Sequence, residues 1–248
     1  RNRGSLTLAW QIGMASGIQE GGKLLFKPNL SATRAEAATM LVQVYERYTS
    51  KLDWLHGFYA ISSYSQIGLT ASMDAVSVGW ARMEYTAQTG PTVNTTSAGG
   101  NGWVVPQDPT AATSYFQKEQ LPYNLCVFGS AYDTVTLASG GTTSTVAAVT
   151  ATSESRAQAI RALVNQAASY SGITIDFEGL KNKNGLKESF STFMTELRAA
   201  LPAGKSLYVC VQPGPYNDGF NFRTLGQACD KVILMAHDYR PPVSDLKV

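Results

Sequence analysis

The chain has 248 residues, of which 44% are hydrophobic and 15% charged, a composition that can bury a sizeable core and that excludes an intrinsically disordered protein. Its formal net charge is +2, from 20 Lys and Arg against 18 Asp and Glu, and no basic run stands out. This excludes binding to nucleic acid or a membrane surface by bulk charge. No stretch of sequence reaches the length and apolar character of a membrane span.

Three cysteines and two histidines are scattered along the chain without metal-ligand spacing. We therefore expect no metal and no other cofactor. Cys126 and Cys210 each lie in a short apolar run, and we expect both to be small buried side chains rather than parts of a disulfide framework.

The first fifty residues contain one strong helix signal. Thr33 is a good N-cap, Glu36 completes a capping box, and apolar residues follow at helical spacing up to Tyr48. A Gly-rich turn at residues 17–22 precedes this helix. Since a unit of this size has little core of its own, we expect a small helical N-terminal module over residues 1–50.

From residue 55 onward, apolar strand-like runs alternate with amphipathic helices. The predicted strands cover residues 56–62, 75–83, 124–128, 172–177, 207–212 and 231–236. The predicted helices cover residues 110–119, 153–170, 187–201 and 222–229. Strands that are apolar on both faces and separated by helices predict an α/β fold with a parallel sheet. Residues 88–102 are predicted to form a surface hairpin after the second strand, where such folds build their working face.

Residues 171–179, Ser-Gly-Ile-Thr-Ile-Asp-Phe-Glu-Gly, carry the pattern most informative about chemistry. Alternate side chains of a strand share a face, so Asp176 and Glu178 lie about 7 Å apart on one side of the predicted strand. They lie at its C-terminal end, where α/β sheets place their active sites. Neighbouring carboxylates resist joint ionisation, and one that keeps its proton can act as a general acid. Alternatively, the two acids cap the following helix or pair with Lys181 and Lys183.

This segment resembles the fourth-strand motif D-G-x-D-x-D-x-E of the family 18 glycoside hydrolases. Gly172, Asp176 and Glu178 are in register with that motif, whereas Ser171 and Thr174 stand where the family has its first two aspartates. The two hydroxyl residues hold no charge, so neither can share a proton with Asp176 as an aspartate at its position would.

Three other segments resemble the same family in the same order along the chain. Residues 56–60 are similar to its first strand, and residues 222–230 to the helix that leads into its sixth strand. Residues 232–239 are similar to the sixth-strand motif M-x-Y-D, with His237 in place of tyrosine. The resemblance covers residues 55–248 and points to the branch directed at the spore cortex and peptidoglycan.

The resemblance implies a TIM-type (β/α)8 barrel that is incomplete in this chain and is truncated after the sixth strand. An open barrel of six strands leaves lumen side chains such as Phe58 and Met235 without neighbours. We therefore expect residues 1–248 alone to be oligomeric, strand-swapped or poorly stable.

By this resemblance the protein is an enzyme, a glycoside hydrolase of chitinase or N-acetylglucosaminidase type that cleaves β-1,4 linkages in a polymer containing N-acetylglucosamine. Glu178 is implied to be the general acid. Asp176 is implied to hold the substrate N-acetyl group, whose carbonyl oxygen attacks the anomeric carbon in substrate-assisted, retaining catalysis. Asp238 and His237 are implied to contact the acetamido group. The remaining implied substrate-binding residues are Tyr59, Gln212, Met235 and Tyr239, with ordinary core packing an equal alternative for the aromatics and Met235.

The departures from the motif leave two alternatives open. The first is a carbohydrate-binding protein with little or no catalysis on the same barrel. The second is a structural cell-wall anchor whose barrel spaces other modules.

Residues 17–36 resemble the second part of an S-layer homology domain, through Gly17-Ile, Phe26-Lys-Pro-Asn and Thr33-Arg-Ala-Glu. Such a module implies binding to an anionic secondary cell-wall polymer and an extracellular, wall-associated bacterial protein. In the alternative interpretation, Arg34 and Glu36 only support the capped start of the helix.

Overall fold

The structure is a computed structural model that describes residues 17–27, 29–49, 52–213 and 218–236, together with the single positions 4, 7, 9 and 10. The chain divides into two compact units, Arg1–Asp53 and Trp54–Val248.

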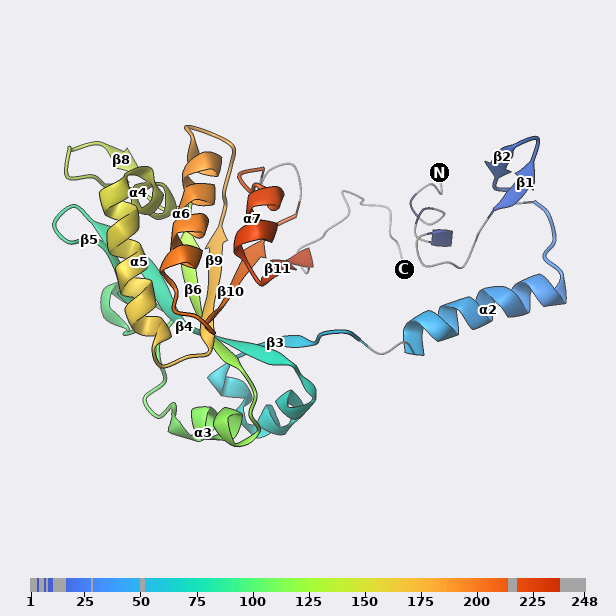
Figure 1. Ribbon diagram of the computed structural model, residues 1–248, viewed down its shortest axis with the longest axis horizontal. Helices are drawn as coiled ribbons and strands as arrows, with labels where there is room; N and C mark the ends of the chain where they lie inside the picture. The colour runs from blue at the N-terminus through green and yellow to red at the C-terminus, as the bar shows by residue number, and fades with distance from the viewer. Residues whose placement is uncertain are drawn as a thin grey trace. The chain divides into compact units, whose positions relative to one another are not determined.

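The first unit contains a short hairpin followed by a helix (Figure 1). Strands β1 (Ile18–Glu20) and β2 (Lys23–Leu25) pair antiparallel across Gly21 and Gly22, which both have the positive φ that a two-residue hairpin turn favours. The predicted Gly-rich turn is therefore present. The two strands themselves escaped prediction, because each has only three residues and none of them is buried.

Helix α2 (Arg34–Thr49) begins with the predicted capping box. The Thr33 hydroxyl accepts a hydrogen bond from the Glu36 backbone N–H at 3.2 Å. In return the Glu36 carboxylate accepts the Thr33 backbone N–H at 2.7 Å. The prediction of a capped helix at this position is confirmed, because a capping box depends only on residues close in the sequence.

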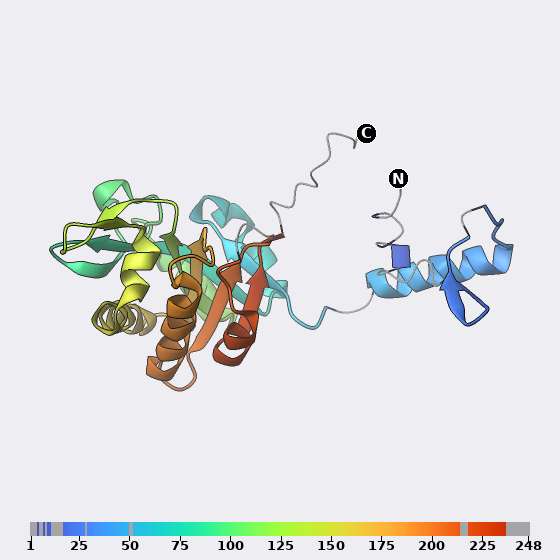
Figure 2. The ribbon, with the colours of Figure 1, turned by 90° about the horizontal axis from the view of Figure 1, so that it is seen from above.

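The described residues of the second unit form a curved sheet of seven strands (Figures 1 and 2). Six of them run parallel in the order β11-β10-β9-β6-β4-β3, and β5 (Gly90–Asn94) pairs antiparallel with β4. The parallel strands are β3 (His56–Tyr59), β4 (Ala75–Thr86), β6 (Tyr123–Ser130), β9 (Gly172–Glu178), β10 (Ser206–Val211) and β11 (Lys231–Leu234).

Helices connect the parallel strands, and α4 to α7 cover one face of the sheet (Figures 1 and 2). The helical segments are η1 (Ile61–Ser72), η2 (Ala98–Gly100), α3 (Thr110–Lys118), α4 (Thr145–Ala151), α5 (Ser153–Ala167), α6 (Leu186–Ala200) and α7 (Phe222–Ala228). Between β6 and α4 the chain forms a small hairpin of β7 (Val135–Thr136) and β8 (Thr142–Thr143).

This architecture is a half-barrel of six parallel strands and their helices, an incomplete TIM-type barrel, as predicted. A hairpin is present near the one predicted over residues 88–102, but with other bounds: β5 pairs with the end of β4 itself, so only one of its arms lies within that range. Several elements differ from prediction. Helix η1 and the β7–β8 hairpin were not predicted, and β11 ends at Leu234 rather than at residue 236. The first strand ends at Tyr59, because η1 takes up the residues that follow, and α4 was not predicted, because it begins inside a Gly/Ser/Thr-rich stretch that reads as a loop.

The main core lies between the sheet and the helices. On β9, Ile173, Ile175 and Phe177 are buried on the helix side, where the Phe177 ring stacks on Phe193 of α6 at 5.8 Å between centroids. Gly129 on the neighbouring β6 leaves room for that ring, because a Cβ there would lie 2.5 Å from it. The alternation predicted for β9 is thereby confirmed for its apolar side chains. The other face of the strand points into the barrel lumen.

Aromatic side chains from opposite sides of the sheet, at β3 and at β10, meet at the N-terminal end of the lumen. Trp54 stacks on His56 of β3 at 5.1 Å, and both rings contact the edge of Tyr208 of β10 at 5.6 and 5.8 Å. The Lys231 ammonium of β11 lies 4.6 Å above the Trp54 ring, in a cation–π contact. These contacts link β3 to β10 and β11 across the lumen at this end, whereas Phe58, nearer the other end of β3, is 53% exposed, as expected for an open barrel.

Among the helices that the structure describes, none is both long and apolar enough to cross a lipid bilayer.

Candidate functional site

Asp176 and Glu178 lie on the lumen face at the C-terminal end of β9. They are in register with Phe128 and Ser130 of β6, the adjacent parallel strand. The Asp176 side chain is buried, with 6% of the residue exposed, and Glu178 is half-buried. The structure therefore brings both predicted carboxylates to one end of the lumen, with the outer one accessible to a ligand.

Gln212, directly after β10, links the Glu178 carboxylate to the backbone. Its Nε2 donates to Glu178 Oε2 at 3.4 Å, and its Oε1 accepts the Gly179 N–H at 2.7 Å. Gly179 has φ +79°, a left-handed conformation that favours glycine and turns the chain out of the strand. The amide thus holds together the carboxylate and the turn that follows it. Gln212, predicted to bind substrate, therefore lies beside Glu178.

Two thiols flank Asp176, one on each neighbouring strand. Cys126 of β6 and Cys210 of β10 are both free and buried, as predicted. The Cys210 thiol is hydrogen-bonded to Asp176. Burial, followed by the negative charge of Asp176, raises the pKa of both thiols well above the ordinary cysteine value. Both cysteines therefore stay protonated at neutral pH, and the Cys210 thiol can donate to the carboxylate.

The two positions where the motif has aspartates carry hydroxyl groups in neutral hydrogen bonds. The Thr174 hydroxyl lies 2.7 Å from Ser77 Oγ, which in turn lies 2.9 Å from His56 Nε2. The Ser171 hydroxyl accepts the Tyr123 backbone N–H at 3.0 Å and so joins β9 to β6. Burial lowers the pKa of His56 to about 4, so its ring is neutral at pH 7. The network below Asp176 is therefore uncharged.

A pocket of about 540 Å³ opens beside Asp176. Its walls include Phe58 of β3 and Trp103, whose indole stacks on Phe128 at 4.8 Å with an interplanar angle of 11°. Gly79 of β4 makes space for the indole, since a Cβ there would lie 3.1 Å from it. Aromatic walls around a carboxylate provide apolar surface for the faces of a sugar ring and a polar group for its substituents.

Sequence reasoning did not assign Trp103 to the site. Its only signal was its position directly after the predicted hairpin that follows the second strand, in a loop at the working face.

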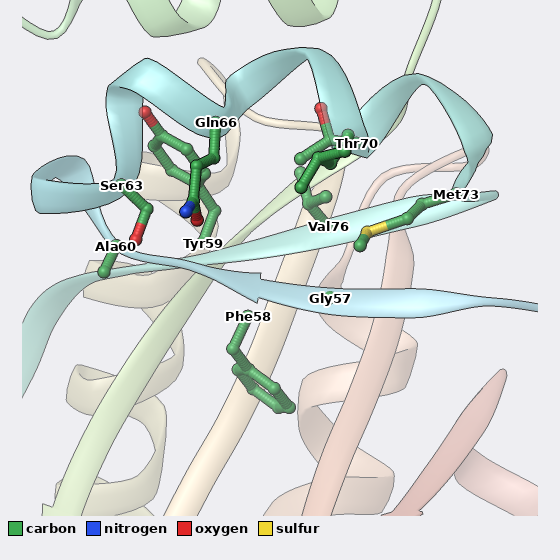
Figure 3. A pocket seen from close by; sticks show the side chains of 10 residues that line it. Gly57, Phe58, Tyr59, Ala60, Ser63, Gln66, Thr70, Met73 and Val76 are labelled. Carbon is green, nitrogen blue, oxygen red and sulfur yellow. The ribbon is translucent and has the colours of Figure 1, made fainter.

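Tyr59 borders this pocket. Its ring, however, lies on the η1 side of β3, opposite Phe58, where it lines a separate, smaller pocket of about 210 Å³ that Figure 3 shows. There it packs edge-on against Phe116 of α3 at 5.3 Å and belongs to the core. Its buried hydroxyl has no hydrogen-bond partner among the described residues, and burial raises its pKa. Its hydroxyl therefore belongs to the layer between sheet and helices.

The other predicted site residues lie at and beyond the end of β11. Met235 is half-buried, and its backbone N–H donates to the Val211 carbonyl at 2.9 Å, which extends the β10–β11 pairing. His237, Asp238 and Tyr239 lie outside the described residues. Within the described part of the chain, no group of His, Cys, Asp or Glu side chains is arranged to hold a metal ion.

Comparison with protein families matches residues 60–247 to the family described as glycosyl hydrolases family 18. Comparison with curated proteins found no match.

Solved structures similar to this chain include a chitinase from Chromobacterium violaceum, with 28% sequence identity and a TM-score of 0.57 over 76% of this chain and 57% of that one. A class V chitinase from Pseudomonas fluorescens has 21% identity and a TM-score of 0.58 over 74% and 54% of the two chains. The spore cortex-lytic enzyme SleL of Bacillus cereus has 13% identity and a TM-score of 0.56 over 76% and 44%. This chain thus spans about half the length of these structures.

Proposed function

Since the chain belongs to family 18 of the glycosyl hydrolases, we propose that it is a chitinase-like enzyme that cleaves β-1,4 linkages in a polymer containing N-acetylglucosamine. The observation that carries this proposal is the pair of carboxylates at the C-terminal end of β9, beside a pocket with aromatic walls. The similar structures from C. violaceum and P. fluorescens are chitinases, which supports the same substrate class.

Glu178 is the general acid in this proposal. Its half-buried carboxyl group is reached from solvent and is held by Gln212, so it can donate its proton to the glycosidic oxygen as the bond to the anomeric carbon breaks. The carbonyl oxygen of the substrate N-acetyl group forms the new bond to that carbon. Water then attacks from the side that the leaving group vacated, and Glu178 takes its proton, so the configuration is retained.

Asp176 orients the N-acetyl group and stabilises the positive charge that develops on it. The Cys210 thiol and the neighbouring strands hold this carboxylate in a buried position, where a fixed charge acts more strongly than in water. Asp238 and His237 are also proposed to contact the acetamido group. Met235 and Tyr239 are proposed to line the substrate-binding site.

A glutamine substitution tests the acid. Glu178→Gln keeps the size of the side chain and the contact to Gln212 but removes the transferable proton. We expect kcat on chitin oligosaccharides to fall by about a hundredfold or more, with oligosaccharide binding retained. Unchanged kcat would rule out Glu178 as the acid.

The hydroxyls at positions 171 and 174 favour a second candidate, a carbohydrate-binding protein on the same barrel. Thr174 and Ser171 supply no charge, and their hydrogen bonds are structural contacts within the sheet. Binding of chitin oligosaccharides by the unsubstituted chain, without hydrolysis, would select this candidate. A chain with neither binding nor hydrolysis would favour a structural cell-wall anchor.

For the first unit we propose an S-layer homology module that binds an anionic secondary cell-wall polymer, and hence an extracellular, wall-associated protein. The motif Thr33-Arg-Ala-Glu and its capping box support this proposal. Sedimentation of the chain with purified cell walls, before and after removal of the secondary polymer, tests it. Equal binding to both wall preparations would contradict it.

A further inference from the structure

The sequence contains two Asn-Gly pairs, Asn101-Gly102 and Asn184-Gly185. In such a pair the backbone nitrogen of the glycine can attack the side-chain carbonyl carbon of the asparagine, because glycine has no Cβ to hinder the approach. The two pairs therefore start with the same chemistry. The structure places them in different surroundings, and these surroundings decide which of the two can react.

The side chain of Asn101 is fixed in a buried turn. Its Nδ2 donates to the carbonyls of Asn94, Thr96 and Trp103 at 3.1, 2.9 and 2.8 Å. Its Oδ1 accepts the Trp103 N–H at 2.8 Å, and only 4% of the residue is exposed. Attack by the Gly102 nitrogen requires this amide to leave its hydrogen bonds first, so Asn101 can react only from an opened form of the loop.

Asn184 and Gly185 are the central residues of an exposed turn in the loop between β9 and α6. The Leu186 N–H closes the turn by donating to the Lys183 carbonyl at 3.1 Å, and the two central residues have φ of +54° and +74°. Among the described residues, neither the Asn184 side-chain amide nor the Gly185 N–H has a hydrogen-bond partner. No atom beyond the adjoining residues lies within 4 Å of the place that a Cβ on Gly185 would take. Solvent therefore reaches both reacting groups, and no neighbouring side chain restrains them.

We propose that Asn184 is a site of spontaneous deamidation in the folded protein and that Asn101 is not. The Gly185 nitrogen gives up its proton and forms a bond to Asn184 Cγ, and the side-chain nitrogen leaves as ammonia, which closes a succinimide ring. Water then adds to one of the two ring carbonyls and breaks its bond to the ring nitrogen, which regains a proton. The product is aspartate or isoaspartate, depending on which of the two bonds breaks.

The modification changes the charge of a groove beside the proposed general acid. Asn184 lines this groove, of about 750 Å³, together with Lys181, Lys183 and Gly179, the residue directly after Glu178. A carboxylate at position 184 offsets part of the positive charge of the two lysines. It also lies at the N-terminus of α6, where the helix dipole favours a negative charge. The aspartate product is therefore compatible with the fold. The inference does not depend on the proposed function.

Peptide mapping by mass spectrometry tests the proposal on the full chain, kept in warm, mildly alkaline buffer either folded or unfolded in urea. In the folded chain we expect Asn184 to convert at least about tenfold faster than Asn101, whereas in urea the two convert at similar rates because no fold protects Asn101. Isoaspartate appears beside aspartate at position 184, because both come from the same ring. The rate rises with pH, because the attacking nitrogen must lose its proton.

Two variants locate the reaction within the loop. Asn184→Gln removes the acidic species that appears first on isoelectric focusing of the folded chain, because the longer side chain must close a larger ring that forms more slowly. Asn182→Gln is the matched control, since Asn182 is exposed in the same loop but is followed by Lys183 instead of glycine. This variant leaves conversion at Asn184 unchanged.

Two results would overturn the inference. In the first, Asn184 converts in urea but stays intact in the folded chain, which would mean that the turn protects it. In the second, Asn101 converts as fast as Asn184 in the folded chain, which would mean that its buried hydrogen bonds give no protection.

Discussion

The half-buried ring of His56 makes the stability of the second unit depend on pH. The ring lies between Trp54 and Phe58 with Tyr208 at its edge, and Nε2 lies 2.9 Å from Ser77 Oγ. Among the described residues no carboxylate contacts it, and the Lys231 ammonium lies 4.6 Å from the centroid of the Trp54 ring that stacks on it. Protonation would therefore place a second positive charge in a largely apolar cluster, and burial lowers the pKa of His56 to about 4.

The sign of the effect follows from the two pKa values. An unfolded chain binds the proton below about pH 6.5, whereas the folded chain binds it only near pH 4, so stability falls as the pH decreases between these values. The full loss in the free energy of unfolding that this pKa difference implies is about 3.4 kcal/mol, at about 1.36 kcal/mol per pKa unit. Because the half-buried ring is partly screened by solvent, we expect about half of this, or about 1.5 kcal/mol by pH 4.5.

Urea unfolding at several pH values between 7.5 and 4.5 measures the effect. The matched variant is His56→Gln, which keeps a group able to hydrogen-bond Ser77 but does not titrate. Carboxylates also titrate over this range, so the relevant quantity is the difference between the two proteins. The unsubstituted chain is expected to lose about 1.5 kcal/mol more than the variant. Parallel loss of stability in both proteins would refute the reasoning.

Three other predictions concern single contacts. Gln212→Ala removes the amide that holds the proposed acid, and we expect kcat to fall about tenfold or more with KM little changed, measured by steady-state hydrolysis of chitin oligosaccharides. Gly129→Ala places a Cβ 2.5 Å from Phe177 and should cost about 1–3 kcal/mol in urea unfolding, whereas Gly141→Ala, with open space around it, should cost less than about 0.5 kcal/mol. Thr33→Ala removes the cap of α2 and should destabilise that helix by about 1 kcal/mol in amide exchange, an effect that Thr33→Ser avoids.

The parts of the fold that were predictable are those encoded by nearby residues. The capping box at Thr33 and the alternation along β9 each depend on residues a few positions apart, and both were found as predicted. The end of β3 and the helix α4 were missed, because their residues do not carry such a local signal. Residues 61–72 and 145–151 lack a clean helical or strand period, and tertiary packing decides their conformation.

The surroundings of the carboxylates could not be predicted, because they depend on which strands become neighbours. Cys126 and Cys210 lie on either side of Asp176, although they are 50 and 34 residues away from it along the chain. Their positions follow from the register of β9 with β6 and with β10. Sequence pattern marked both cysteines only as small buried side chains.

These strand neighbours determine the electrostatic setting of the proposed chemistry. Around Asp176 the structure places two protonated thiols. Two residues earlier on β9 lies Thr174, whose hydroxyl is hydrogen-bonded to Ser77. Apart from Glu178, which carries the transferable proton in the proposed reaction, the groups named here are neutral, so none of them competes with Asp176 for a positive charge. In a buried site, a carboxylate with such neutral neighbours stabilises a nearby positive charge more strongly than one screened by water. The substitution of hydroxyls for aspartates at positions 171 and 174 is thus compatible with a reaction in which positive charge develops on the substrate N-acetyl group.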